Sequence, residues 1–282
     1  MEQLLSLLKT IPEYAAMVSS LQGGESVAVT GIGQINRSHM IAGLCRSINR
    51  PMVVLCQDDL AARRLQEELK GFLLDTAPIL PGRDLTLYDA AVVSRSWEQK
   101  RLRQLYDLAT GKTGLQIMTW ESLSLRTMPK AALLAAAFSL EVGREYAVED
   151  LISRLTAAGY NRCGMVEGPG QFAVRGGILD IFSPAEDRPV RAEFFGDELD
   201  TMGFFDPATQ RRSENITSVT VLPVAETQPG LHPGGVEGLC KDITSLISRQ
   251  KRRKNINEPL IATLEKDLNK YESGLHLSLI HI

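Results

Sequence analysis

The sequence predicts an α/β protein in which a parallel-sheet domain, at residues 1–144, precedes a small antiparallel α+β domain at 145–226. Two observations indicate this order. Strand and helix patterns alternate in the first half, which is typical of a parallel sheet covered by helices on both faces. Residues 171–205 instead show two consecutive hairpin patterns, which indicate an antiparallel sheet. A linker and a helical return segment are expected at 227–276.

The elements of the first half are predicted from hydrophobic periodicity. Apolar runs bounded by turn residues indicate buried strands, and longer runs with a helical period indicate helices. The expected strands are 26–30, 52–56 and 115–119, and the expected helices are 37–47, 59–70 and 97–108, with Asp59 as a cap. The alanine-rich residues 129–142 are too few to span a bilayer, which takes about 20 apolar residues. We expect a buried connector there and an amphipathic helix at 146–158.

The second half opens with a hairpin pattern whose two faces differ. Phe172 and Val174 share one face of a strand, so Arg175 lies on the other face and points away from the core. The glycine pair at 176–177 can supply the positive φ of a two-residue turn, and 178–182 then returns as the partner strand. The pattern predicts a small antiparallel sheet with one face that carries polar residues.

A second hairpin pattern follows at 190–205, and with it the chain shows a resemblance to a known family. The segments VRGGILDIF at 174–182, EFFGDE at 193–198 and FDPATQR at 205–211 carry this resemblance. Together they make the run 160–226 similar to the second domain of UvrB and of transcription-repair coupling factors of the Mfd type. The first half is similar to the first domain of the same proteins, a degenerate relative of the helicase-like domain of UvrB.

The resemblance implies that the second domain docks UvrA, the damage-sensing subunit of nucleotide excision repair, through basic residues on the sheet. Residue matching places Arg162 and Arg175 at such positions. The partner-binding set that it implies is Arg162, Arg175, Asp180, Arg191 and Glu193. UvrB proteins have a further arginine where this chain has Ala173, and this departure favours a coupling factor over UvrB.

The residues alone also allow a simpler interpretation of Arg162 and Arg175. Each could form a surface ion pair with Glu167, Asp180 or Glu193, and an exposed ion pair contributes only about 0–1 kcal/mol to stability. A guanidinium group can also present a rigid fork to a partner carboxylate, and arginine is enriched among the residues that dominate interfaces. Both interpretations stay open at this point.

A degenerate nucleotide loop follows the first expected strand. The phosphate-binding pattern G-x-x-x-x-G-K-[ST] aligns with Gly31, Gly33, Asn36, Arg37 and Ser38, so Asn36 replaces the second glycine and Arg37 replaces the lysine. Asn36 adds a Cβ where the backbone must approach phosphate, and Arg37 substitutes a bulky fork for a compact ammonium group. We expect no nucleotide binding here, although the helix N-terminus could still attract an anion.

A second departure separates the two functions that the resemblance implies. In UvrB an aromatic-rich hairpin that probes damaged DNA is inserted near the segment matching 84–94, where this chain leaves no room for it. With the altered loop, this favours a non-catalytic, UvrA-recruiting N-terminal module of a transcription-repair coupling factor, which links stalled RNA polymerase to nucleotide excision repair. The alternative is a truncated UvrB-like, ATP-dependent protein that verifies DNA damage.

The C-terminal part contains two helical patterns and two short segments of other character. The helices are expected at 236–247 and 259–271, and the basic run at 249–254 lies between them. That run is either a solvated helix end or a contact to nucleic acid. The last residues, LSLIHI at 277–282, equal the translation of a common transposon-adapter sequence, so we expect them to be exogenous and the native frame to stop near residue 276.

Composition limits the other classes of function. The formal charge of −3 over 282 residues gives no general attraction to nucleic acid. The four cysteines lack CxxC spacing and the four histidines form no HExxH pair, so neither a metal site nor a disulfide framework is indicated, and we find no catalytic triad. We expect a cytoplasmic chain without membrane contact. The resemblance assigns ATP, Mg, RNA polymerase and double-stranded DNA to parts of a longer parent, and UvrA to this chain.

Overall fold

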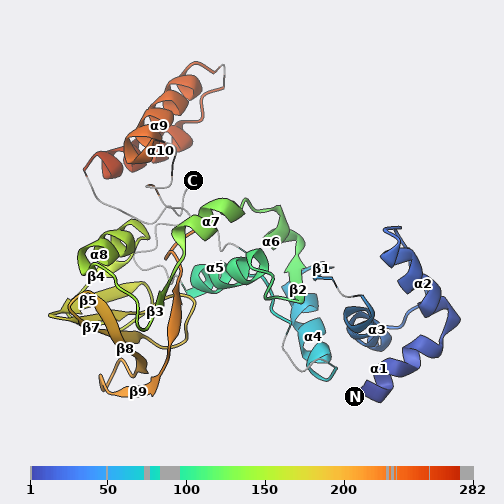
Figure 1. Cartoon of the computed structure of the whole chain (residues 1–282). Coiled ribbons are helices and arrows are strands. Elements are labelled where there is room, and N and C mark those ends of the chain that lie inside the picture. Colours follow the sequence, from blue (N-terminus) through green and yellow to red (C-terminus); the bar gives the residue numbers. More distant parts are fainter. Residues whose placement is uncertain are drawn as a thin grey trace. The chain divides into compact units, whose positions relative to one another are not determined.

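The computed structural model describes residues 2–48, 50–72, 77–82, 96–226, 229, 232, 234–253 and 255–273. Contacts within the chain divide it into two compact units (Figure 1). The first unit comprises Met1–Asp84 and Gln104–Arg126, and the second comprises Leu85–Arg103 and Thr127–Ile282. The segment 84–94, where the sequence predicts that no hairpin is inserted, lies outside the described residues.

The first unit contains a parallel pair of strands with helices packed against it. Its elements are α1 (Glu2–Leu7), the 3₁₀ helix η1 (Leu8–Thr10), α2 (Pro12–Gln22), α3 (Gln34–Ser47), β1 (Met52–Cys56), α4 (Asp59–Lys70), β2 (Leu115–Thr119), α6 (Trp120–Ser124) and the later residues of α5 (Ser96–Ala109). β1 pairs in parallel with β2, and Ile79 forms a further parallel bridge to Ile117. Ala62 and Leu69 of α4 pack with Ile117 in the core of this unit. The larger helicase-like sheet stays a prediction.

Two predictions for the first half are wrong in detail. The expected strand at 26–30 is not a strand, and Val27 and Val29 are 38% and 46% exposed. An apolar run has strand propensity, but its backbone also needs a neighbouring strand, and none pairs with it among the described residues. The side chain that caps α4 is Asp58, which accepts a hydrogen bond from the backbone N–H of Ala61 at 2.8 Å, rather than Asp59.

The predicted connector at 129–142 is also different from the expectation. It forms α7 (Lys130–Ala136) and β3 (Phe138–Glu141), and only some of its residues are buried. Leu133 is buried whereas Leu134 is 38% exposed, because a helix on the surface of a unit buries one side only. β3 pairs antiparallel with β10 (Ser218–Val221).

The second unit is built on a six-stranded sheet with the strand order β4-β5-β6-β7-β8-β9. Its strands are β4 (Asn161–Arg162), β5 (Gln171–Arg175), β6 (Ile178–Ile181), β7 (Val190–Phe195), β8 (Glu198–Phe205) and β9 (Arg212–Asn215). All neighbouring pairs are antiparallel except β4 and β5. Both predicted hairpins are therefore confirmed as β5–β6 and β7–β8.

Helix α8 (Val148–Ala157) lies across one face of this sheet (Figure 1). Leu151 and Leu155 of α8 pack on Phe172 and Ile181 in the main core. The opposite face, predicted to be polar, carries a second and smaller apolar cluster around Phe205, together with Val166, Ala173 and Phe182. This cluster covers one end of the face and leaves its polar residues on the remainder.

Tyr160 joins the sheet to the chain that follows it. Its hydroxyl donates a 2.7 Å hydrogen bond to the carbonyl oxygen of Leu222, and both residues are buried. Burial raises the pKa of Tyr160 above its ordinary value of 10.0, because a phenolate loses hydration in the core. The folded state therefore holds Tyr160 neutral over a wider pH range than the unfolded state does.

Replacement of Tyr160 by Phe should lower the free energy of unfolding by about 0.5–1.5 kcal/mol at pH 7, because the Leu222 carbonyl loses its donor. A raised folded-state pKa means that this contribution is complete below about pH 10 and is lost as the pH rises through the folded-state value. Urea unfolding at pH 7 and pH 10.5 measures both effects. The prediction fails if wild type and Tyr160→Phe lose the same stability between these two pH values.

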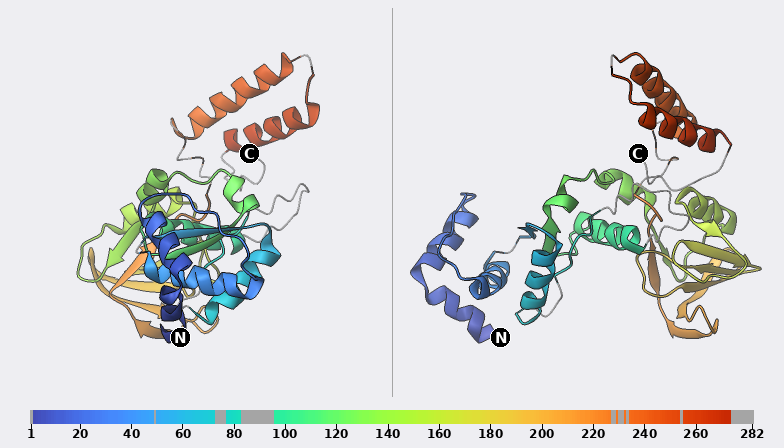
Figure 2. Two further views of the ribbon diagram at one scale, coloured as in Figure 1. Left: turned by 90° about the vertical axis from the view of Figure 1, so that its right-hand side faces the viewer. Right: turned by 180° about the vertical axis from the view of Figure 1, so that it is seen from behind.

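The C-terminal part of the second unit is an antiparallel pair of helices (Figure 2). They are α9 (Gly235–Lys251) and α10 (Glu258–Glu272), and each extends beyond the predicted range. Ile243 and Ile247 of α9 pack with Ile261, Leu264 and Tyr271 of α10. Among the described residues, no helix combines the length and the hydropathy that a bilayer crossing requires.

Candidate protein-docking surface

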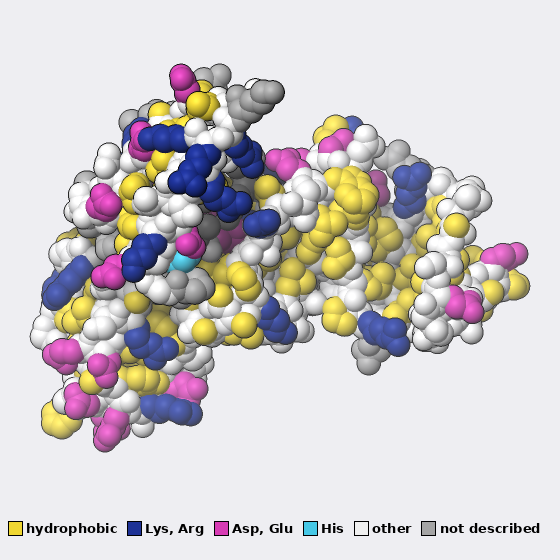
Figure 3. Space-filling model, turned by 90° about the horizontal axis from the view of Figure 1, so that it is seen from above, with side chains coloured by type: hydrophobic (Ala, Val, Ile, Leu, Met, Phe, Trp, Pro, Cys, Tyr) yellow, Lys and Arg dark blue, Asp and Glu magenta, His cyan; other side chains and the backbone are white. Residues whose placement is uncertain are grey.

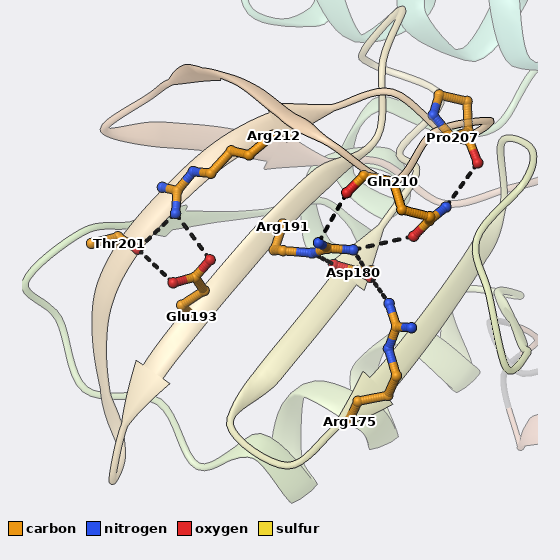
Figure 4. Close-up of polar contacts among 8 residues, drawn as sticks. All are labelled: Arg175, Asp180, Arg191, Glu193, Thr201, Pro207, Gln210 and Arg212. Atoms are coloured by element: carbon orange, nitrogen blue, oxygen red, sulfur yellow. Dashed lines mark hydrogen bonds and ion pairs between the residues drawn. The ribbon is translucent and has the colours of Figure 1, made fainter.

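The polar part of the sheet face is organised by a buried carboxylate on β6. Asp180 stands opposite Arg191 of β7 in the strand register, and its side chain is 1% exposed. Arg191 donates from Nε to Oδ1 of Asp180 at 2.7 Å and from Nη2 to Oδ2 at 2.9 Å. Arg175 donates from Nη2 to the same Oδ2 at 2.8 Å (Figure 4). One anion thus holds two guanidinium groups, which satisfies the requirement that a buried charge be paired.

Arg191 is held in place from several sides. Its guanidinium lies over the ring of Phe205, 4.6 Å from the centroid, and also donates to the backbone and side-chain oxygens of Gln210 at 3.3 and 3.2 Å. Hydrogen bonding to Asp180 raises the pKa of Arg191 further above its ordinary value, because the carboxylate stabilises the charged guanidinium. Gln210 has a φ of 60°, which is rare for a non-glycine residue, and its Nε2 donates to the Pro207 carbonyl at 2.8 Å.

A second polar cluster adjoins the first on the same face. Arg212 of β9 donates from Nη1 to Glu193 at 3.0 Å and to the hydroxyl of Thr201 at 3.0 Å. Thr201 in turn donates to the other oxygen of Glu193 at 3.3 Å (Figure 4). The side chain of Glu193 is 41% exposed, so this carboxylate remains accessible to a partner.

Arg175 is the arginine that this network presents outward. Its side chain is 46% exposed although it contacts a carboxylate that is almost fully buried. Only Nη2 of Arg175 donates a hydrogen bond to Asp180, so Nε and Nη1 of the guanidinium group have no hydrogen-bond acceptor among the described residues. The structure therefore contains the ion pair between Arg175 and Asp180 that the simpler interpretation predicted. This ion pair leaves two nitrogen atoms of Arg175 available to donate to a partner carboxylate.

The structure places Arg162 apart from Arg175. This residue is exposed on the short edge strand β4, where it stands beside Phe172 in the register. Phe172 packs into the core on the α8 side of the sheet, whereas Arg175 belongs to the other face. The two arginines therefore share a sheet but not a face, because Arg162 stands beside Phe172 whereas Arg175 is three residues, an odd number, beyond Phe172.

Asp180 and Arg191 are also different from the expected partner contacts. Asp180 is too deeply buried to touch a partner, and the side chain of Arg191 is only 16% exposed. Asp180 instead fixes Arg175 through its Oδ2, and Arg191 fixes Asp180. The sequence reasoning missed Gln210, Thr201 and Arg212, which complete the network; Arg212 lies on an edge strand whose residues show no apolar alternation.

A turn followed by a helix is present at the degenerate nucleotide loop, but the helix begins at Gln34, three residues before the predicted start at 37. Gly31 has a φ of 79°, and Gly33 precedes the first residue of α3 without a side-chain cap. Asn36 and Arg37 are exposed in the first turn of α3, while Ser38 is 2% exposed. Asn36 and Arg37 thus occupy the turn that would face a phosphate in a nucleotide-binding loop. The hydroxyl of Ser38, which would bind a metal ion in such a loop, is buried.

The sheet with its polar face falls within a known domain. Residues 138–226 match the family described as the UvrB interaction domain. Every residue of the two polar clusters lies inside this range. The match begins at β3 and ends at Glu226, so it comprises α8, the six-stranded sheet and β10.

Relatives of the chain extend the similarity beyond this domain. A transcription-repair-coupling factor of Myxococcus xanthus is 32% identical over 221 residues, which are 76% of this chain and 18% of that protein. The chain is homologous to transcription-repair-coupling factors. Those of Bacillus subtilis and Escherichia coli are 25% and 27% identical over 97% and 77% of this chain. The chain spans 18% to 24% of the length of these three relatives.

Proposed function

We propose that this chain recruits UvrA to a transcription-repair coupling factor, through the UvrB interaction domain at 138–226. The exposed guanidinium of Arg175, fixed from below by buried Asp180, is the observation that carries the proposal. A side chain fixed before binding loses little conformational freedom when the partner arrives, which favours affinity. Glu193 places an accessible carboxylate nearby, so the face suits a partner with both acidic and basic groups.

Replacement of Arg175 by Ala should weaken the complex with UvrA by about 1–4 kcal/mol, the range expected of an interface hot spot. Arg188 supplies a matched control, because it is 47% exposed and pairs with a carboxylate, Glu214, at 2.8 Å. It lies over Phe204, whose side chain packs on the α8 side of the sheet, away from Arg175. Titration of UvrA with wild type and both variants measures the difference. Equal affinity of Arg175→Ala and wild type contradicts the assignment.

Arg162→Ala tests whether the contact extends around the sheet edge. The resemblance implies that Arg162 contacts UvrA, whereas its register partner Phe172 packs on the α8 side of the sheet. A loss comparable to that of Arg175→Ala indicates a partner that wraps around β4. A wild-type affinity restricts the contact to the face of Arg175.

We propose further that the chain acts in transcription-coupled nucleotide excision repair without catalysis of its own, in the cytoplasm. Asn36 and Arg37 stand where nucleotide binding requires glycine and lysine, which supports this part. The parent protein would supply ATP and Mg binding and the contacts with RNA polymerase and double-stranded DNA. Measurable ATP affinity of the chain that disappears in Ser38→Ala would favour a UvrB-like enzyme instead.

A further inference from the structure

The C-terminal end of α9 concentrates positive charge on the helical pair. Arg249, Lys251, Arg252 and Arg253, here called the basic end of α9, are all exposed. Arg249 and Lys251 lie in the last turn of α9, and Arg252 is its C-cap residue with a helical conformation. Arg253 follows directly, and its backbone N–H donates to the carbonyl oxygen of Gln250 at 3.1 Å. Figure 3 shows Lys and Arg side chains gathered over this pair of helices.

Three of the four cations have no recorded partner. Lys251 pairs with Glu265 of α10 at 2.7 Å. For Arg249, Arg252 and Arg253 the described part of the chain records neither an ion pair nor a side-chain hydrogen bond. Arg252 and Arg253 follow Arg249 by three and four residues, so the three side chains leave the chain within about one turn at the end of α9. The result is a compact group of exposed guanidinium groups.

The stability of α9 does not explain this group. A cation in the last turn of a helix interacts favourably with the helix macrodipole. Lys251 already provides such a cation, and its ion pair with Glu265 connects it to α10. Like charges at a spacing of three or four residues repel one another and destabilise a helix. Three guanidinium groups gathered at the end of α9 repel one another in the same way, and an anionic partner would relieve this repulsion.

The chemistry of the group selects a phosphate backbone. Guanidinium groups bind phosphate through paired N–H bonds, and a cluster of arginines on one face is the electrostatic footprint of nucleic-acid binding. Single strands are usually bound with aromatic side chains on which bases stack. Tyr271 is the aromatic residue of the α9–α10 core, and it is 7% exposed, so it offers no stacking surface. We propose that the basic end of α9 binds the phosphate backbone of duplex DNA without reading its sequence.

Fluorescence anisotropy of a labelled duplex of about 20 base pairs, titrated with the whole chain between about 50 and 200 mM salt, tests this proposal. Three phosphates neutralised give an expected slope of about −2.7 for log K against log salt. The triple variant Arg249→Gln, Arg252→Gln, Arg253→Gln should lose at least about tenfold in affinity at the low-salt end, with an unchanged or higher melting temperature.

The matched control is Arg63→Gln, Arg64→Gln, Arg126→Gln, which removes an equal number of positive charges, three, from exposed positions of the first unit. It should retain wild-type affinity for the duplex. An equal loss in both triple variants shows a general effect of net charge and overturns the proposal. So does the absence of wild-type binding at about 50 mM salt, or displacement of the duplex by polyglutamate at equal charge, which indicates an acidic protein partner.

Discussion

Replacement of Glu226 by Gln should lower the free energy of unfolding by about 3–5 kcal/mol, the range expected when one partner of a buried ion pair is removed. Glu226 and Arg101 are both 0% exposed at their side chains, and Arg101 Nε donates to Glu226 Oε1 at 2.7 Å. The carboxamide keeps the size of Glu226 but removes its charge, so the buried guanidinium loses the carboxylate that its Nε contacts. Urea unfolding followed by circular dichroism gives the free energy.

A double variant distinguishes the contribution of the two charges from the contribution of side-chain packing. Arg101→Met with Glu226→Leu removes both charges and keeps apolar volume, so it should recover most of the stability that Glu226→Gln loses. Arg103 and Asp187 form the exposed comparison, with Asp187 90% exposed, and Asp187→Asn should cost less than about 1 kcal/mol. A loss below 1 kcal/mol in Glu226→Gln contradicts the description of this pair as buried.

Asp180→Asn is the second substitution with a large expected effect. It should destabilise the chain by about 2–4 kcal/mol, somewhat less than for a fully enclosed pair because Arg175 can turn toward solvent. The amide removes the charge beneath Arg175 and Arg191 and offers each of them a weaker acceptor. Thermal unfolding measures the loss, and Asp187→Asn again serves as the exposed control.

The same substitution should weaken UvrA binding, for a different reason. Without the Asp180 carboxylate, Arg175 no longer has a fixed direction, and the partner must order it on binding. An Asp180→Asn variant that is fully folded at the temperature of the titration, yet binds UvrA as well as wild type, would show that Arg175 needs no support.

The hairpins of the second unit could be predicted because their signal is local. Alternation in β5 and β6 and the glycine pair between them fix both the strands and the side of Arg175. β9 could not be found in this way, since an edge strand of Arg-Ser-Glu-Asn has no buried side to reveal it. The run at 26–30 shows the opposite case, in which strand propensity exists without a partner strand in the described structure.

The polar network was only partly accessible to sequence reasoning. The register of β6 against β7, which places Asp180 opposite Arg191, depends on the connection at 182–189, so only the pairings inside each hairpin follow from local pattern. The burial of Asp180 does not, because it depends on packing around Phe205 and on a turn that brings Gln210 to Arg191. The pair of Arg101 and Glu226 joins residues 125 positions apart and leaves no local pattern at all.

The central claim is that Asp180 acts on UvrA binding by holding Arg175 outward, and a double-mutant cycle tests it most directly. UvrA is titrated calorimetrically with wild type, Asp180→Asn, Arg175→Ala and the double variant, below the melting temperature of each. The account predicts that Asp180→Asn weakens binding in wild type but changes nothing once Arg175 is Ala. Full additivity of the two losses, or no loss in Arg175→Ala, would contradict it.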